Sequence, residues 1–408
     1  MLRARCFLTA VPLILIMLIG GTPARAVNDF DRLLVINGLS ETLTLIDRAG
    51  DSIVPNILTL GLAPNRIRLA PGAILLVHSI SDDLWVLDLD SYAHVRTLKF
   101  PDGDNPWDVV AIDDTLCALS MLVAGNVALA NYVTGDTLGR LLTGKSPEGM
   151  IVVDSNLWVA NTGFDFGTFL YDPGTVTVMN AYTGAPVATI PVGTNPQSLT
   201  RVSDGTVHVL CTGNYFDQFG IVYVIDPSAL SVVDSIALGG SPGDLVAGSE
   251  GMAYVAAGGW ADSGEVYRYD ALARTVLNGA ANPWHSGRGV TAVVPRLEGG
   301  VFALCFSADS VAGHALNGGV MESYQVGDGP QAAAHITNRR PGDLDEDGYV
   351  TALDLGGMID LLFAGAPPPT RPGSSDVNAD CFYDVLDLGM LVDFLFAGAA
   401  TLYWGCAN

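Results

Sequence analysis

Apolar and polar residues alternate along most of the chain, in short runs separated by Gly, Pro, Asn and Asp. Between residues 33 and 336 the same sequence pattern repeats. Each repeat has a segment of alternating apolar and polar residues, a polar turn, a second such segment, a Gly and a Pro, and then a new apolar segment. Residues 175–202 (TVTVMNAYTGAPVATIPVGTNPQSLTRV) are an example. Alternation with period two, bounded by turn residues, is typical of half-buried β-strands. Since almost none of this region has helical periodicity, the pattern predicts a mostly β protein built from repeated strand-rich units.

The number of units can be counted from one position, called the anchor here, which lies just before the strand that opens the next unit. Six units have a Pro there and one has Arg288, and successive anchors lie 41 to 49 residues apart. A period of 40 to 50 residues with about four strands per unit is typical of the blades of a β-propeller. The seven anchors predict seven blades: Pro64, Pro106, Pro147, Pro196, Pro242, Arg288 and Pro330.

The two ends of this region complement each other. The first unit, from Leu33, lacks its own innermost strand, and one spare strand, 331–336, follows the last anchor. We therefore expect a seven-bladed β-propeller over 30–337, closed by its N- and C-terminal strands. A six- or eight-bladed ring or a pair of sandwiches fits the strand count less well.

The V-x-V-I-D and N-P plan resembles the YVTN-type repeats of exported bacterial seven-bladed propellers, and the resemblance implies architecture only.

The N-terminal segment, 1–26, has the pattern of a signal peptide. Arg3 and Arg5 precede an apolar run over 7–19, and Ala24-Arg25-Ala26 ends in an A-x-A cleavage pattern. No later stretch is long and apolar enough to cross a bilayer. We therefore expect an exported protein that is extracellular, at the cell surface or periplasmic.

Charge narrows the possible partners. Without residues 1–26 the chain has 16 basic and 43 acidic residues, a net charge of −27. A chain this acidic repels nucleic acid and anionic membranes, which excludes both as partners. The cysteines do not suggest a disulfide framework: Cys117, Cys211 and Cys305 look like buried strand residues, and whether Cys381 and Cys406 pair stays open.

A calcium-loop pattern occurs twice near the C-terminus, at 343–354 and again at 376–387. Oxygen-bearing residues at positions 1, 3, 5, 9 and 12 of a twelve-residue loop, with a backbone carbonyl at position 7, are the ligands that Ca²⁺ requires. The predicted ligands of the first loop are Asp343, Asp345, Asp347, Tyr349, Thr351 and Asp354. Those of the second loop are Asp376, Asn378, Asp380, Phe382, Asp384 and Asp387. Because Cys381 replaces the turn Gly in the second loop, we expect two calcium sites, the second one weaker.

Each loop is followed by a segment with helical periodicity. Two apolar stripes are expected to pack against each other: Leu355, Met358, Ile359, Leu362 and Phe363, and their counterparts Leu388, Leu391, Val392, Leu395 and Phe396. A polar hinge, 338–341, precedes the pair, which we place at 342–399 with a tail at 400–408.

These loop–helix repeats resemble a type I-like dockerin, with Asp at loop position 12, no entering helix and a C-terminal place in the chain. The resemblance implies calcium binding and attachment to a cohesin-like or cell-surface protein. In dockerins, loop positions 10 and 11 help recognise a cohesin, commonly through hydroxyls. Here they are Ala352-Leu353 and Val385-Leu386, which fits either an apolar docking surface or internal packing.

Three units have long hairpins between their second and third strands. Aromatic and acidic residues on these hairpins form a candidate binding face for a protein or a glycan: Phe164, Asp165, Phe166, Tyr215, Phe216, Asp217, Trp260 and Asp262. The alternative is that these aromatic rings only pack the hairpins together.

The chain lacks the usual short motifs for haem, zinc or a hydrolase nucleophile. This absence favours an exported, non-catalytic binding or scaffold protein. Two alternatives remain: a secreted hydrolase that acts on a lactone or glycan in the propeller channel, and a structural component of a surface layer or of adhesion. Three or more converging carboxylates or Asn oxygens in the channel would favour the hydrolase. Asn37, Asn161 and Asp217 can be considered for such a site, but nothing in their spacing selects them.

Overall fold

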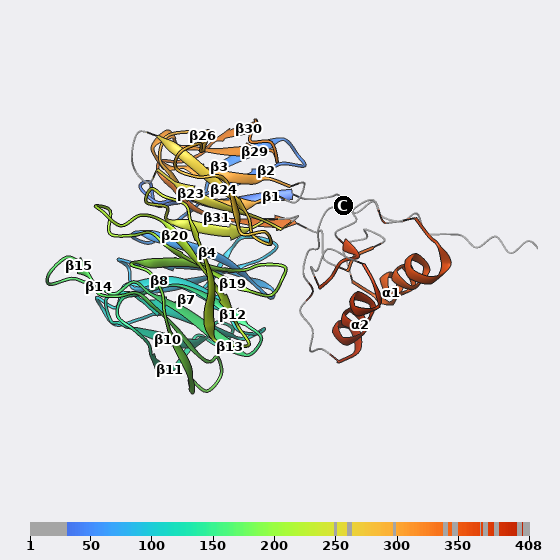
Figure 1. The fold of residues 1–408 in the computed structure, drawn as a ribbon, viewed down its shortest axis with the longest axis horizontal. Helices are drawn as coiled ribbons and strands as arrows, with labels where there is room; N and C mark the ends of the chain where they lie inside the picture. The colour runs from blue at the N-terminus through green and yellow to red at the C-terminus, as the bar shows by residue number, and fades with distance from the viewer. Residues whose placement is uncertain are drawn as a thin grey trace, which may run out of the picture.

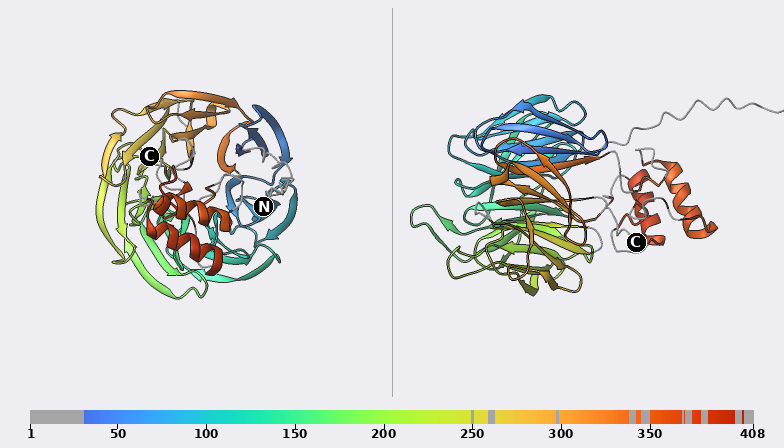
Figure 2. Two further views of the ribbon diagram at one scale, coloured as in Figure 1. Left: turned by 90° about the vertical axis from the view of Figure 1, so that its right-hand side faces the viewer. Right: turned by 90° about the horizontal axis from the view of Figure 1, so that it is seen from above.

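The repeated strand pattern folds into seven antiparallel sheets arranged around a central axis (Figures 1 and 2). The computed structural model describes residues 31–248, 251–258, 263–296, 299–337, 342–344, 350–367, 369, 374–378, 383–397 and 402. The predicted signal peptide, residues 1–26, and the two C-terminal cysteines lie outside the described residues. The prediction of a seven-bladed propeller followed by a small helical pair is confirmed.

The first three blades follow one another along the chain, each with its innermost strand first. The first is made of β4 (Pro64–Ala70), β5 (Ala73–His78), β6 (Asp83–Asp88) and β7 (His94–Lys99). The second is made of β8 (Pro106–Ala111), β9 (Leu116–Met121), β10 (Asn126–Asn131) and β11 (Asp136–Leu142). The third is made of β12 (Pro147–Val153), β13 (Asn156–Asn161), β16 (Thr175–Asn180) and β17 (Pro186–Pro191), and it carries the hairpin β14 (Phe164–Asp165) and β15 (Leu170–Tyr171).

The next three blades repeat this order. The fourth is made of β18 (Pro196–Arg201), β19 (Val207–Cys211), β20 (Ile221–Asp226) and β21 (Ser231–Ala237). The fifth is made of β22 (Asp244–Ala247), β23 (Met252–Ala257), β24 (Gly264–Asp270) and β25 (Thr275–Asn278), with β26 (Trp284–Ser286) also paired to β24. The sixth is made of β27 (Val290–Pro295), β28 (Val301–Cys305), β29 (Ser310–His314) and β30 (Val320–Gln325), with a 3-10 turn, η1 (Phe306–Ala308).

The seventh blade joins the two ends of the propeller. Its strands are β31 (Pro330–Thr337), β1 (Asp31–Asn37), β2 (Thr42–Asp47) and β3 (Ser52–Thr59), in that order from the axis. β1 and β31 pair along their whole length, and His335 Nε2 lies 2.6 Å from Asp31 Oδ1 at one end of the pair. The prediction that a strand from each terminus closes the ring is confirmed.

One anchor was assigned to the wrong residue. In five of the other blades the Pro pairs with the end of the neighbouring strand next to a register shift, as in Pro196↔Cys211. In the sixth blade Val290 has this place, paired with Cys305, and Arg288 lies two positions earlier. The preceding Gly289 has φ +71°, close to the left-handed φ of +58° at Asn195 before Pro196. The unit keeps the backbone conformation without the Pro, so a search for Pro could not locate it.

The hydrophobic core lies between the blades. Each of its main clusters joins two neighbouring sheets, for example Leu75 and Val77 of β5 with Leu119 of β9. A blade therefore buries its apolar faces only when both neighbours are present, and the ring depends on closure.

The tail contains two short helices, α1 (Ala352–Ile359) and α2 (Val385–Val392). Each continues into a π-helical turn, η2 (Asp360–Ala364) and η4 (Asp393–Ala397). Buried Met358, Leu361 and Leu391 form the centre of their core. Half-buried apolar residues surround this centre: Leu344, Val350, Leu355, Leu362, Leu388, Leu395 and Leu402. None of the helices in the described part of the chain has the length and apolar character of a membrane span.

The predicted apolar stripes were partly wrong. Four of their ten members are exposed, whereas Leu361, which was not included, is buried. A π-helical turn changes the angular spacing of side chains, so residues beyond 359 and 392 leave the face expected from regular α-helical periodicity. The exposed members are Phe363 and Phe396, which lie in these turns, and Ile359 and Val392, the last α-helical residues, whose exposure the turns do not explain.

The hairpins and the tail lie at opposite faces of the ring. Pro147 at the start of β12 pairs with Asn161, so the β14–β15 hairpin lies at the end of the ring where the innermost strands begin. β31 also begins at that end and leaves the ring at Thr337, paired with Asp31 at the other end. Figures 1 and 2 show the helices on the side of the ring opposite this hairpin.

Two truncations test ring closure. A chain ending at residue 337 keeps β31 and should unfold cooperatively with the β signal of the full chain in circular dichroism. A chain ending at residue 329 exposes the inner edge of β1 together with the apolar faces of two blades, so we expect loss of the cooperative transition or aggregation. Equal behaviour of the two truncations would show that β31 is dispensable.

Candidate functional site

The last residue of each predicted calcium loop closes that loop with its carboxylate. Asp354 accepts hydrogen bonds from the backbone N–H of Thr351 at 2.7 Å and of Leu344 at 2.7 Å. Thr351 is the N-cap of α1, and its side chain accepts a bond from the Leu353 N–H, which completes a capping box. One buried carboxylate thus fixes both the start of the helix and the beginning of the loop.

The second loop closes in the same way. Asp387 accepts hydrogen bonds from the backbone N–H of Asp384 at 2.8 Å and of Asn378 at 3.1 Å. Asp384 caps α2 and forms the matching capping box. The repeat seen in the sequence is therefore also a repeat of local structure.

The charge of the tail fits a bound cation. Asp343 and Asp376, at the first position of each loop, are buried together with Asp354 and Asp387. Residues 342–408 contain eleven acidic residues and a single basic one, Arg371. Buried carboxylates need a compensating charge, and Ca²⁺ with oxygen ligands provides it.

Five of the twelve predicted ligands lie outside the described residues: Asp345, Asp347, Tyr349, Asp380 and Phe382. The described remainder contains no group of three His, Cys, Asp or Glu side chains that would hold a metal ion by itself.

Loop position 11 is apolar and faces outward in both repeats. Leu353 is 71% exposed, and Leu386, its counterpart in the second repeat, is 63% exposed. Phe363 and Phe396, which also occupy equivalent places in the two repeats, are exposed as well. Of the two explanations for apolar residues at this position, internal packing is therefore excluded for both leucines, and an exposed apolar surface is present twice.

The hairpin face combines packed and free aromatic rings. Phe164 lies 5.0 Å from Phe166 and 5.1 Å from Tyr171 between ring centroids, so it holds the β14–β15 hairpin together. In contrast, Phe166 and Tyr215 are exposed, and Phe216 is 85% exposed. The packing explanation is thus correct for Phe164 and in part for Phe166, but it does not account for Tyr215 and Phe216.

Two of the carboxylates predicted on this face hold the hairpins. Asp165 accepts bonds from the N–H groups of Gly167 and Thr168, and its ion pair with Lys145 helps to lower its pKa. Asp217 Oδ1 accepts a bond from Asn214 at 2.7 Å.

Three further apolar side chains are exposed on the same hairpins: Phe169, Leu170 and Phe219. They are not part of the predicted face, and their only signal in the sequence is that they are apolar residues within the hairpins. Trp260 and Asp262 lie outside the described residues.

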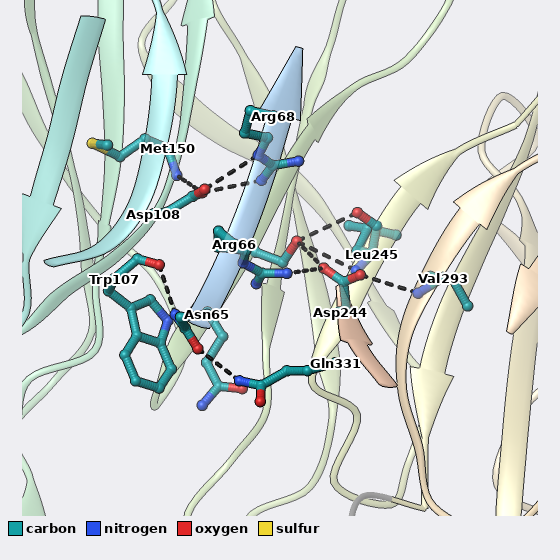
Figure 3. A network of polar contacts seen from close by, with 12 residues as sticks. Asn65, Arg66, Arg68, Trp107, Asp108, Met150, Asp244, Leu245, Val293 and Gln331 are labelled. Atoms are coloured by element: carbon teal, nitrogen blue, oxygen red, sulfur yellow. Dashed lines mark hydrogen bonds and ion pairs between the residues drawn. The ribbon is translucent and has the colours of Figure 1, made fainter. Parts of the chain in front are cut away.

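Three carboxylates that the sequence did not indicate lie on the innermost strands, and two of them face arginines (Figure 3). Asp108 is held by Arg68 through two bonds, of 3.2 Å and 3.0 Å. Asp244 lies 3.7 Å from the guanidinium of Arg66. The third, Glu148, is buried on β12. Because the two aspartates are neutralised by arginines, the three carboxylates do not form the cation site that would favour a hydrolase.

The two aspartates also connect neighbouring blades. Asp108 Oδ2 accepts a bond from the N–H of Met150 at 3.3 Å, and Asp244 Oδ2 accepts one from the N–H of Val293 at 3.2 Å. Ser198 Oγ accepts a hydrogen bond from the N–H of Leu245 at 3.3 Å. These bonds join the inner strand of one blade to that of the next.

The Asn residues considered for the channel have other roles. Asn37 donates to Thr42 and Thr44 within its own blade, and Asn161 donates likewise to Thr175 and Thr177. Asp217 lies on a hairpin, as described above. These three residues therefore do not converge on a site.

The pKa values of Asp108 and Glu148 shift in opposite directions. Burial alone would raise the pKa of Asp108, but the charges of Arg68 and Arg66 and the bonds it accepts hold its pKa below the ordinary value. Burial raises the pKa of Glu148 to about 8, although Arg66 opposes the shift. At neutral pH the Glu148 carboxyl therefore carries a proton.

Residues 341–395 match the family model described as Dockerin type I domain, and this segment is a dockerin type I domain. Such domains bind calcium and cohesins and occur in extracellular proteins. No curated protein matches the chain.

Solved structures similar to the chain share its propeller fold. Hydrazine synthase from Kuenenia stuttgartiensis aligns with a TM-score of 0.56 and 13% identity, over 66% of this chain and 88% of that one. A functionally unknown protein from Desulfotomaculum acetoxidans aligns with a TM-score of 0.57 and 12% identity, over 75% and 98%. A quinonprotein alcohol dehydrogenase-like protein from Bacteroides thetaiotaomicron aligns with a TM-score of 0.55 and 13% identity, over 75% and 77%. At these identities the likeness shows the fold alone.

Glu148 should make the stability of the protein depend on pH. Its pKa is about 8 in the folded state and about 4.3 in the unfolded chain. The folded state therefore holds one more proton between these values, and stability falls as pH rises from about 4.5 to 8. Relative to Glu148→Gln, the wild type should lose about 3 kcal/mol in the free energy of unfolding between pH 5.5 and 8, measured by urea titration. The exposed Asp102→Asn is the matched control, and parallel pH profiles of wild type and Glu148→Gln would contradict the assignment.

Proposed function

We propose that this is an exported, non-catalytic binding protein. Its dockerin domain attaches it, in a calcium-dependent way, to a cohesin-like partner on a scaffold or on the cell surface. The propeller presents its hairpin face to a second protein or a glycan. The domain boundaries in this proposal are a signal peptide at 1–26, the propeller at 30–337, a linker at 338–341, the dockerin module at 342–399 and a tail at 400–408.

The observation that carries the proposal is the pair of equivalent apolar surfaces on the dockerin helices. Leu353 and Leu386 are exposed at matching places, and Phe363 and Phe396 repeat the same arrangement at the other end of each helix. Clustered exposed apolar side chains on a small acidic module are costly unless a partner covers them. The partner therefore presents an apolar surface, rather than the acceptors that hydroxyl-bearing dockerins would need.

The hairpin face supports the second half of the proposal. Phe166, Phe169, Tyr215, Phe216 and Phe219 are exposed on adjacent blades, and aromatic rings contribute strongly to interfaces. Because the chain leaves β31 at the opposite face, attachment through the dockerin leaves these hairpins accessible.

Two calcium sites belong to this proposal, the second one weaker. The ligands are those predicted from the two loops, with Cys381 at the turn position of the second loop. A residue with a Cβ at a turn that normally takes Gly strains the backbone, so binding there costs more free energy.

Calcium should stabilise the tail through the loop-closing carboxylates. We expect Ca²⁺ to raise the melting temperature of the dockerin transition in calorimetry and chelator to reverse the rise. Asp354→Ala should remove most of this shift, and Asp387→Ala should remove less because the second site is weaker. Asp360→Asn, an exposed carboxylate in η2, is the matched control and should leave the shift unchanged. A melting temperature that changes neither with calcium nor with chelator would refute the metal site.

The apolar surfaces should decide partner binding. Leu353→Ser combined with Leu386→Ser should weaken capture by a panel of purified cohesin modules at least about tenfold, because the buried apolar contact is lost. The calcium shift in melting temperature should stay as in the wild type, since neither side chain is buried. Exposed Leu142→Ser, on β11 of the propeller, is the control. Unchanged capture by the double variant would show that the partner binds elsewhere.

A further inference from the structure

We propose that the central channel of the propeller is a binding site for a small carboxylate, centred on the guanidinium of Arg66. This inference goes beyond attachment and beyond the hairpin face, and it depends on neither. It is based on a cavity, an arginine with unused donors and the polar groups around it.

The cavity lies within the ring of inner strands and has a volume of about 250 Å³. Its polar lining consists of Arg66, Arg68, Ser198, Thr200 and Asp244, and the remaining walls are apolar residues of the inner strands. Sites for drug-sized ligands measure about 300–1,000 Å³. This cavity therefore suits a ligand no larger than a single sugar acid.

Arg66 has donors that the protein does not use. Its side chain is 16% exposed, and no group among the described residues accepts a hydrogen bond from it. Its ion pair with Asp244 spans 3.7 Å, which is too long for a hydrogen bond. A guanidinium has five N–H donors in a planar fork, so Arg66 can offer two parallel bonds to one carboxylate.

The neighbouring groups show why Asp244 does not use these donors. Its Oδ1 accepts a hydrogen bond from the hydroxyl of Ser198 at 3.3 Å, and its Oδ2 accepts one from the N–H of Val293 at 3.2 Å (Figure 3). Both oxygens are therefore held by other blades. Arg68, in contrast, already donates two hydrogen bonds to the carboxylate of Asp108.

Glu148 of β12 does not line the cavity, and it does not add a competing negative charge. It is 8% exposed, and no hydrogen bond of its carboxyl to the described residues is found. Arg66 and Asp108 are the charged groups that act on it, and Tyr171 and Tyr215 are nearby. Burial raises the pKa of Glu148 to about 8, so at neutral pH it adds no negative charge beside Arg66.

The charge balance selects the class of ligand. Arg66 and Arg68 offset Asp108 and Asp244, and Glu148 is neutral, so the channel has little net charge but an excess of donors. One planar carboxylate matches this excess, whereas a second negative charge would lack a partner. The carboxylate can belong to a free short acid or to an acidic sugar, whose hydroxyls would face Ser198 and Thr200.

Calorimetric titration of the full-length protein at pH 6.5 tests the site. The probes are acetate and glucuronate, with glucose as the neutral control. We expect the wild type to bind at least one carboxylate probe but not glucose, and Arg66→Gln to weaken that binding at least about tenfold. Arg140→Gln, which removes a surface ion pair with Asp104, should bind like the wild type.

If Arg66→Gln unfolds, a second, charge-balanced variant can be tested in its place. Arg66→Gln combined with Asp244→Asn leaves no buried charge unpaired and should also lose binding. Binding of acetate shows that a carboxylate alone is sufficient, and binding of glucuronate alone shows that the sugar hydroxyls are also needed, with either result supporting the site if Arg66 is required. Failure of both probes, or binding that survives both Arg66 variants, overturns the proposal. Cohesin capture by the same variants should be unchanged, so loss of that function is a separate result.

Discussion

Closure of the ring is the constraint on which the rest of the structure depends. The core lies between blades rather than within them, so every blade needs both neighbours to bury its apolar faces. The pairing of β1 with β31 supplies the last neighbour with ordinary antiparallel hydrogen bonds and no covalent link. Ion pairs reinforce this junction, since Arg48 of the closing blade contacts Glu322 of the sixth blade at 3.1 Å.

The polar network of the channel follows from the same constraint. Seven inner strands converge on the axis without pairing as one sheet, so some of their N–H groups need acceptors from the next blade. Asp108, Ser198 and Asp244 provide these acceptors. Buried aspartates in turn require cations, and the two channel arginines of β4 are placed to provide them. The unused donors of Arg66 are a by-product of this arrangement, and the proposed carboxylate site uses them.

The features that the sequence predicted well are those encoded by short, regular spacing. Strand alternation, the anchor period and the two calcium loops each repeat locally, and the structure confirms seven blades, their closure and the paired loop–helix units. One prediction was wrong because the sixth blade keeps the backbone conformation of the anchor with Val290 in the place of Pro. Another was wrong because π-helical turns change the helical periodicity at Phe363 and Phe396. The channel could not be predicted because its contacts have no local signature: Arg66 and Asp244 belong to different blades, and only the curvature of the closed ring brings them together. The exposed aromatic rings of the hairpins are an intermediate case, since their positions could be read from the sequence but the division into packed Phe164 and free Phe216 depends on tertiary contacts.

Ring closure also determines where an appended module emerges. An innermost strand must begin at the face that carries the Pro anchors and the long hairpins, because the chain enters every blade there. A closing strand supplied by the C-terminus therefore ends at the opposite face, at Thr337. Any domain that follows leaves from that side without crossing the hairpins. The chain can thus hold an attachment module and an exposed recognition face at opposite ends of one rigid ring, and this separation requires no contact between them.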